Sequence, residues 1–221
     1  MPPFEILTFD CYGTLIDWQR GMREALAGLV KSKGLPLDVG AMHERYSEIE
    51  RELQGGFYRR YREVMRIGVE TAFGEQGVGL TWSESNVLAD TLPTWPVFPD
   101  TTEVLGQLKD KGCKLVILSN IDDDLVRRSV EVLGVEFDGV ITAQQVGSYK
   151  PAHNHWNRML EELGVAKERV LHVAQSYFHD VVPAKEMGYT MAWINRKGET
   201  PAGQARPDYE FPDLRGLLTI L

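Results

Sequence analysis

The sequence predicts an α/β fold in which a doubly wound parallel sheet carries an inserted helical cap. Three observations predict this class. Apolar runs of strand length recur along the chain, segments with helical spacing alternate with most of them, and one long stretch after the first run shows helical spacing only. Strands and helices that alternate at these lengths form parallel βαβ units, whose helices cover both faces of the sheet.

The first expected strand, Glu5–Asp10, is apolar through most of its length, as is typical of a strand that is buried on both faces. It ends in CYGTLID, where Gly13 and Thr14 favour a turn. From about Trp18 to Ala89 the apolar residues follow a helical period, and no convincing strand interrupts them. We therefore expect an α/β core formed by residues 1–16 and 95–221, and a helical cap formed by residues 17–94.

The second part of the chain opens with a Pro-punctuated loop and a helix in TWPVFPDTTEVLGQLKDKG, with Thr101 or Asp100 as the expected N-cap. Further strands are expected at Cys113–Asn120, in GVITAQQVG, at Arg169–Ser176, at Thr190–Asn195 and in YEF. Helices are expected in DDDLVRRSVEVLGV, HNHWNRMLEELGV, VVPAKEMGY and PDLRGLLTIL. The acidic start of DDDLVRRSVEVLGV suits the positive end of a helix dipole.

The composition argues against several classes of function. The chain has 221 residues and a formal net charge of -8, and it contains no run of Lys and Arg. Such an acidic chain is a poor ligand for the phosphate backbone of nucleic acids. No stretch resembles a leader peptide or is apolar for long enough to span a bilayer, so we expect a cytoplasmic protein. Cys11 and Cys113 lie in apolar strand-like segments, which favours buried reduced thiols over a disulfide.

Polar side chains follow four of the expected strands. They are Asp10 after the first, Ser119 and Asn120 after the second, Lys150 after the third, and Ser176 to Asp180 after the fourth. Singly, each has an ordinary structural role, because Asp closes turns, Ser and Asn cap helices, and a lysine beside a proline is usually solvated. Ligands of an open parallel sheet bind beyond the carboxyl ends of its strands, so the four ends together indicate an active site.

The order of these residues resembles the four-motif pattern of the haloacid dehalogenase superfamily. That pattern is DxxGTL after an apolar strand, [ST]N after a second, a lysine before a proline, and an acid after a later strand. Here it appears as FDCYGTLID, VILSN, SYKP and VAQSYFHD, and it covers nearly the whole chain because the helical stretch resembles the superfamily's cap. Each motif alone is weak, whereas the combination is specific.

Two positions depart from the magnesium-dependent phosphatases that make up most of this superfamily. In those enzymes the Asp of the first motif is the nucleophile. They typically have a second Asp two residues after it and a Gly-Asp pair at the end of the fourth strand. This chain has Tyr12 at the first position and Ala174-Gln175 at the second. Magnesium prefers carboxylate and water oxygens, so we expect no metal and no other cofactor.

The tyrosine in DxYGTL and the segment AWINR (Ala192–Arg196) resemble the L-2-haloacid dehalogenase branch. That branch usually has Ser-Ser-Asn where this chain has Gln175-Ser176-Tyr177. LTFDCYGTLIDW, SNID and VGSYKP look closer to a sister group that includes the azetidine-2-carboxylate hydrolase, which opens a strained ring. The resemblance therefore implies carbon–halogen hydrolysis of a small 2-substituted carboxylic acid first, ring-opening or other C–N hydrolysis second, and phosphate ester hydrolysis third. A binding protein that has lost catalysis is the remaining alternative.

The resemblance implies covalent catalysis. Asp10 would attack the α-carbon in line with the leaving group and form an ester. Lys150 would hold Asp10 ionised, since an adjacent cation lowers the pKa of a carboxyl, and Thr14 would orient it. Water would then attack the ester carbonyl with Asp180 as general base, and His179 is the rival base.

The expected ligand is a small carboxylic acid, with no nucleic acid and no membrane partner, and a homodimer is an alternative to a monomer. Cap closure would exclude water from the site. The residues expected to bind the substrate from the core are Cys11, Tyr12, Ser119, Asn120 and Ser176. From the cap, Arg45 is expected to reach the substrate or leaving group, with Tyr46, Tyr58, Arg59 and Arg60 as alternatives.

Overall fold

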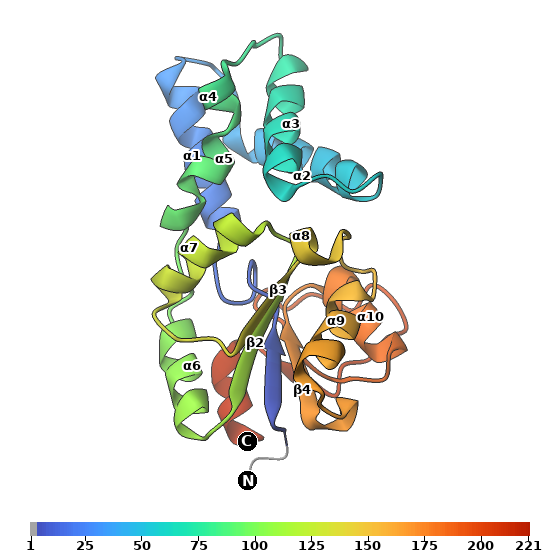
Figure 1. Cartoon of the computed structure of the whole chain (residues 1–221). Helices are drawn as coiled ribbons and strands as arrows, with labels where there is room; N and C mark the ends of the chain where they lie inside the picture. The colour runs from blue at the N-terminus through green and yellow to red at the C-terminus, as the bar shows by residue number, and fades with distance from the viewer. Residues whose placement is uncertain (1–3) are drawn as a thin grey trace.

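A six-stranded parallel sheet forms the centre of the computed structural model, which describes residues 4–221 (Figure 1). Its strand order is β3-β2-β1-β4-β5-β6, and every neighbouring pair is parallel. The strands are β1 (Ile6–Phe9), β2 (Lys114–Ser119), β3 (Gly139–Thr142), β4 (Val170–Ala174), β5 (Thr190–Ile194) and β6 (Tyr209–Phe211). The doubly wound prediction is confirmed. From β1 the chain adds β2 and β3 on one side and then β4, β5 and β6 on the other, so the strand order reverses between β1 and β4, which is where such sheets bind ligands.

Helices cover both faces of this sheet. In Figure 1, α6 (Thr101–Asp110) and α7 (Asp123–Leu133) lie on one side, and α9 (Asn154–Leu163) and α10 (Val182–Glu186) lie on the other. Shorter elements connect them: α8 (Ala143–Val146), η2 (Lys167–Arg169), the π-turn η3 (Tyr177–Val181) and, near the chain end, η4 (Leu214–Thr219).

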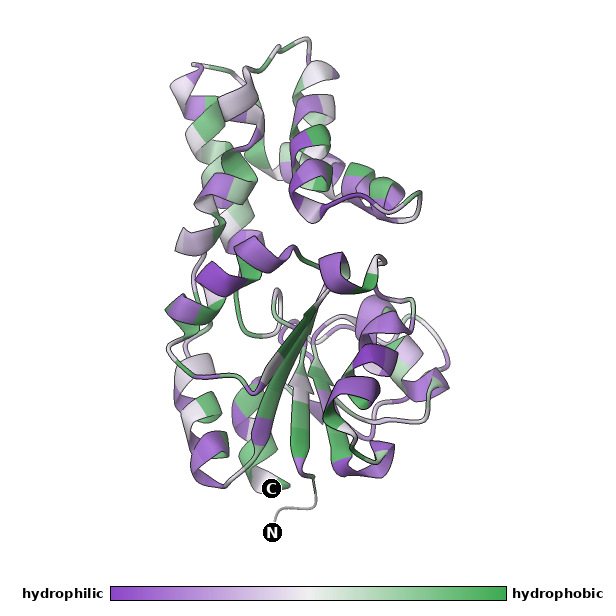
Figure 2. Cartoon of the chain, viewed as in Figure 1, coloured by the Kyte–Doolittle hydropathy of each residue, from purple (hydrophilic) through white to green (hydrophobic). Residues whose placement is uncertain are grey.

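The strands read as continuous apolar runs because each face of the sheet has its own core. Leu7 and Phe9 of β1 belong to a cluster with residues of α6 and α7, whereas Ile6 belongs to a second cluster with residues of α9 and α10. Successive side chains of a strand point to opposite faces, so both sets are buried at once. Figure 2 shows this as green strands between helices whose outer surfaces are mostly purple.

The helical insert, residues 17–94, follows β1 and contains no strand. Its elements are α1 (Trp18–Ser32), α2 (Val39–Gln54), α3 (Tyr61–Gly74), α4 (Trp82–Ser85), α5 (Val87–Thr91) and η1 (Leu92–Thr94). The two connections to the core lie side by side, because Ile16 and Val97 form an antiparallel bridge and the Asp17 N–H donates to the Pro96 carbonyl at 2.8 Å. The insert therefore joins the core through a paired stalk.

Some local expectations differ from the structure. The strand expected in GVITAQQVG stops at Thr142, because Thr142 and Gln145 form a capping box that starts α8. Asp100 occupies the N-cap position of α6, but its carboxylate accepts hydrogen bonds from Arg196 and from the Leu214 N–H instead of capping the helix. The segment expected as a terminal helix is the 3₁₀ turn η4.

Both cysteines, Cys11 and Cys113, are buried and unpaired, as expected. Within residues 4–221, none of the helices combines the length and the apolarity that crossing a membrane requires.

Asp122, directly after the second strand end, links the core to the insert. Its carboxylate accepts the backbone N–H groups of Tyr61 and Arg62, each at 2.9 Å. These groups open α3, whose own N-cap residue, Arg60, makes no side-chain capping bond. Asp122 is buried and thus serves as a remote cap for a helix of the insert.

We predict that Asp122→Ala lowers the free energy of unfolding by about 2 kcal/mol, since it removes the cap of α3 and the contact between insert and core. The matched control is Asp124→Ala, which removes an exposed ion pair with Arg62 and should cost less than about 1 kcal/mol. Denaturation in urea measures both variants. Equal stability of the two variants would contradict the capping role.

Candidate active site

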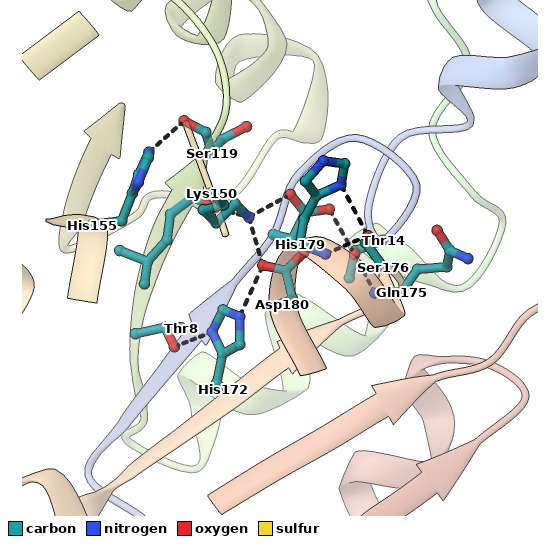
Figure 3. A network of polar contacts seen from close by, with 12 residues as sticks. Thr8, Thr14, Ser119, Lys150, His155, His172, Gln175, Ser176, His179 and Asp180 are labelled. Carbon is teal, nitrogen blue, oxygen red and sulfur yellow. Dashed lines mark hydrogen bonds and ion pairs between the residues drawn. The ribbon is translucent and has the colours of Figure 1, made fainter. Parts of the chain in front are cut away.

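The ammonium group of Lys150 lies at the centre of the polar network in Figure 3. Its Nζ donates to Asp10 Oδ1 at 2.9 Å, to Asp180 Oδ1 at 2.6 Å and to the Leu118 carbonyl at 2.9 Å. An ammonium has three hydrogens, so these bonds use all of them. The side chain is 1% exposed. The structure therefore brings together the first, second and fourth strand ends around one buried cation.

Asn120 holds this lysine in place from the second strand end. Its side-chain carbonyl accepts the Lys150 N–H at 2.7 Å, and its amide donates to the Lys150 carbonyl at 3.0 Å. Both ends of the Asn120 amide are thus occupied by the backbone of Lys150. We expected Asn120 to bind the substrate; because its side chain positions the lysine, its backbone N–H is the group left for a ligand.

Thr14 orients Asp10, as expected from the turn after the first strand. The Thr14 hydroxyl donates to Asp10 Oδ2 at 2.9 Å and accepts the Gln175 N–H at the same distance. Gly13, at a φ of 106°, lets the chain turn back so that Thr14 faces the carboxylate. Each oxygen of Asp10 therefore accepts one hydrogen bond, from Lys150 or from Thr14, and the carboxylate has a fixed direction.

A histidine that sequence reasoning missed lies beneath Asp180. The Nε2 of His172 contacts Asp180 Oδ1 at 3.1 Å, and its Nδ1 contacts the Thr8 hydroxyl at 2.8 Å (Figure 3). A carboxylate accepts hydrogen bonds, so Nε2 of His172 is the donor to Asp180. The available signal was a histidine in the middle of the apolar run VLHVA, a position that needs a buried polar partner.

Burial and the lysine set the protonation of the two carboxyls. Burial raises the pKa of Asp10 above its ordinary value, and Lys150 opposes this rise. For Asp180, burial acts in the same direction, but Lys150 and His172 outweigh it and hold the pKa well below the usual range. The negative charges of both carboxylates in turn raise the pKa of Lys150 against its burial. Beside Asp10, the site thus contains a lysine that stays protonated, Lys150, and a carboxyl that stays ionised, Asp180.

A cavity of about 140 Å³ lies next to this network. Cavities of about 150 Å³ hold a ligand the size of benzene, so this space accommodates a small acid. The core lines it with Asp10, Tyr12, Ser119, Asn120, Lys150, Gln175, Ser176, His179 and Asp180, and Trp18, Glu50, Gln54, Tyr61 and Trp95 complete the wall from the insert and its connection.

Backbone donors also face this edge of the sheet. Among residues 4–221, the N–H groups of Cys11, Tyr12 and Asn120 donate to no other residue. Cys11 is buried and is not among the residues that line the cavity, so its thiol is not placed to contact a ligand. The Tyr12 hydroxyl is bonded to Ser129 Oγ at 2.7 Å, which directs it away from a catalytic role. Three free N–H groups at one edge form a site for an anionic group.

The residues that we expected to reach the substrate from the insert do not line the cavity. Arg45, Tyr46, Tyr58, Arg59 and Arg60 are not among the lining side chains. Arg45 donates instead to Glu48 on the exposed side of α2 and to Glu75 at the end of α3. Positions five apart in a helix lie about 140° apart, so the face that carries Glu50 into the cavity turns Arg45 away from it.

His179, the rival base expected from the sequence, lines the cavity. Its backbone N–H donates to Ser176 Oγ at 3.1 Å, and its Nδ1 lies 3.1 Å from the same oxygen. Burial lowers the pKa of His179 to about 4, so the ring is neutral near pH 7. Asp180 Oδ2 is buried without a partner among the described residues, which makes it the better base.

The donor set does not fit a magnesium ion. The two carboxylates that the core contributes to the cavity, Asp10 and Asp180, share an ammonium group, and Lys150 occupies the position between them. In residues 4–221, His, Cys, Asp and Glu side chains form no group of three with the spacing of a metal site. Magnesium requires several hard oxygen ligands, and a fixed cation among them repels it.

We predict that Lys150→Met reduces turnover by about 100- to 1000-fold and moves the acid limb of the pH–rate profile to higher pH. Asp10 must be ionised to attack, so activity is lost as the pH falls through its raised pKa. Removal of the lysine removes the effect that opposes this rise. Lys109→Met, which breaks an exposed pair with Asp138, is the control and should leave the profile unchanged. An unshifted acid limb in Lys150→Met would contradict the assignment.

Comparison with known proteins agrees with this architecture. A haloacetate dehalogenase, H-2, from Moraxella sp. (strain B) is 25% identical over 225 residues and covers 100% of this chain and 99% of its own length. A glyceraldehyde 3-phosphate phosphatase from Methanothermobacter thermautotrophicus is 28% identical, with 85% of this chain and 84% of that protein covered.

Among solved structures, an L-2-haloacid dehalogenase from Xanthobacter autotrophicus with covalently bound chloropropionic acid shares the fold. Its TM-score is 0.81 at 24% identity, and 97% of this chain and 96% of that chain are covered. The model of the family described as haloacid dehalogenase-like hydrolase matches residues 4–188. That match spans most of the strands and the whole network around Lys150, and the chain therefore belongs to the haloacid dehalogenase-like hydrolase family.

Proposed function

We propose that this hydrolase cleaves the bond between the α-carbon and the leaving group of a small 2-substituted carboxylic acid, most readily a 2-haloacid. The reaction passes through an ester on Asp10. One observation carries the proposal: a buried lysine holds an oriented carboxylate, Asp10, beside a small cavity. Two residues after Asp10 the chain has Tyr12 and not a second acid. Chemistry that needs no proton on the leaving group suits this arrangement.

In the first step, Asp10 attacks the α-carbon and the halide departs with the bonding electrons. A carboxylate that is only 7% exposed has lost most of its water, and Lys150 and Thr14 hold it in a single direction. The N–H groups of Cys11, Tyr12 and Asn120 would bind the substrate carboxylate, with Ser119 and Ser176 at the same edge. Halide leaves as an anion without protonation, so Tyr12 in place of an acid is no obstacle.

In the second step, water attacks the ester carbonyl of Asp10, the bond between the carbonyl carbon and the ester oxygen breaks, and the 2-hydroxy acid leaves after its oxygen takes up the proton that the water gave to Asp180, which restores the Asp10 carboxylate. Asp180 Oδ2, which has no partner among residues 4–221, accepts a hydrogen bond from this water. Its lowered pKa makes it a weak base, so it acts by orienting the water and by accepting the proton as the attack proceeds. Lys150 stabilises the charge that develops on the ester oxygen, since it remains bonded to Asp10.

The relatives support this choice of substrate class. The Moraxella protein is named for haloacetate, which is a 2-halogenated acid, and the similarity extends over its full length. The phosphatase relative keeps phosphate ester hydrolysis as the alternative. The charges disfavour that alternative, because a phosphate dianion would enter a cavity lined by three carboxyl groups and one lysine, which two of the carboxylates already share. We also propose that residues 17–94 act as a cap that closes over bound substrate, and that the protein works in the cytoplasm, where unpaired thiols persist.

We predict halide release from 2-chloropropionate and related 2-haloacids, unchanged by EDTA, in a screen that also measures ammonia and phosphate. Asp10→Asn should reduce release to background, because a neutral amide is a poor nucleophile. Asp90→Asn, at an exposed carboxylate of the insert, is the matched control and should retain activity. Phosphate release that EDTA abolishes and magnesium restores would replace this proposal with a phosphatase.

A further inference from the structure

The insert contributes an acid to the cavity that the proposed chemistry does not use. Glu50 lies in the last turns of α2 and lines the cavity together with Gln54 and Tyr61. The catalytic network comes from the sheet, so Glu50 belongs to the wall formed by the insert. A substrate between these walls would contact Asp10 with one end and Glu50 with another.

Two phenols fix Glu50 as a hydrogen-bond acceptor. The Tyr61 hydroxyl donates to Glu50 Oε1 at 2.5 Å, and the Tyr46 hydroxyl donates to the same oxygen at 3.4 Å. Burial raises the pKa of both phenols well above the usual range, so they keep their protons and remain donors. Among residues 4–221, no donor reaches Glu50 Oε2, and this second oxygen is therefore available to a ligand in the cavity.

The charges around the cavity favour a donor or a cation at this position. The lining contains three carboxyl groups, those of Asp10, Glu50 and Asp180, and one positive side chain, Lys150. Lys150 already spends its three hydrogens within the core, and His179 is neutral near pH 7. Burial opposes ionisation of Glu50, and a positively charged ligand group beside it would favour the ionised form. By contrast, an anionic ligand group beside Glu50 would be repelled.

We propose that Glu50 binds a protonated amine of the substrate, so that the preferred substrate is a 2-substituted carboxylic acid that also carries an ammonium group. This inference rests on the proposed function for the position of the substrate carboxylate at the free N–H groups of the core. The carboxylate and the ammonium then occupy opposite walls of the same cavity. Substrates with a carboxylate alone leave the second oxygen of Glu50, Oε2, without a hydrogen-bond donor from the ligand, which lowers their affinity.

The position of Glu50 is itself controlled from the core. Asp122 caps the start of α3 through the N–H groups of Tyr61 and Arg62, and the hydroxyl of Tyr61 then bonds Glu50. A contact between the two parts of the molecule therefore fixes the side chain that recognises the amine. Recognition of the amine by Glu50 and the contact between insert and core therefore depend on the same residues, Asp122 and Tyr61.

Equilibrium binding of unreactive acid pairs tests this proposal. The pairs are propionate with 3-aminopropionate and butyrate with 4-aminobutyrate, which differ within each pair only by an ammonium group, and NMR titration measures their affinities. The wild-type protein should bind at least one amino acid about tenfold more tightly than its partner, the effect of one charge-assisted hydrogen bond. Glu50→Gln keeps an acceptor for both phenols and should abolish this preference.

Glu48→Gln, on the exposed side of α2 where Glu48 pairs with Arg45, is the matched control and should preserve the preference. Glu50→Met provides a second variant if Glu50→Gln does not fold, as judged by circular dichroism. Amino acids that bind no better than their partners, including the case in which none binds, would overturn the proposal, as would a preference that survives both Glu50 variants. Binding requires no attack by Asp10, so activity retained in Asp10→Asn would refute the proposed function alone.

Discussion

The contact between the buried ammonium of Lys150 and two carboxylates is the interaction on which the rest of the site depends. A charge at 1% exposure is costly unless opposite charges and hydrogen bonds surround it. Here the partners are Asp10 after β1, Asp180 after β4 and the Leu118 carbonyl in β2. In the sheet, β1 lies between β2 and β4. This strand order brings the three partners of Lys150 to one edge, so the ion cluster depends on the fold.

The same cluster separates the roles of two similar acids. Asp10 has a raised pKa, a fixed direction and access to the cavity, whereas Asp180 is held ionised by Lys150 and by His172 below it. Two carboxyls with environments that displace their pKa values in opposite directions are suited to different steps of one reaction. The insert then adds a third acid, Glu50, on the other wall, where it can select the substrate without taking part in the bond changes.

The residues of the core could be predicted because strand ends are visible in the sequence. Asp10, Thr14, Lys150 and Asp180 each follow an apolar run, and a parallel sheet gathers such positions at one edge. The residues of the insert could not be predicted in this way. Which face of α2 meets the cavity depends on how the helix packs, so the choice of Arg45 had no basis in periodicity, and Glu50 was not identified. The positioning role of Asn120 and the presence of His172 could not be predicted for a related reason: their partners, Lys150 and Asp180, are set by tertiary contacts.

Transfer of oxygen from Asp10 is the central claim, and a single turnover in heavy-oxygen water tests it most directly. With enzyme in excess over a 2-haloacid, the hydroxyl oxygen of the product should come from the Asp10 carboxylate and be largely unlabelled. The label should instead appear in the peptide that contains Asp10, because water attacks the ester carbonyl. Label in the product of the first turnover, with none in that peptide, would show that water attacks the substrate carbon directly and would contradict the covalent mechanism.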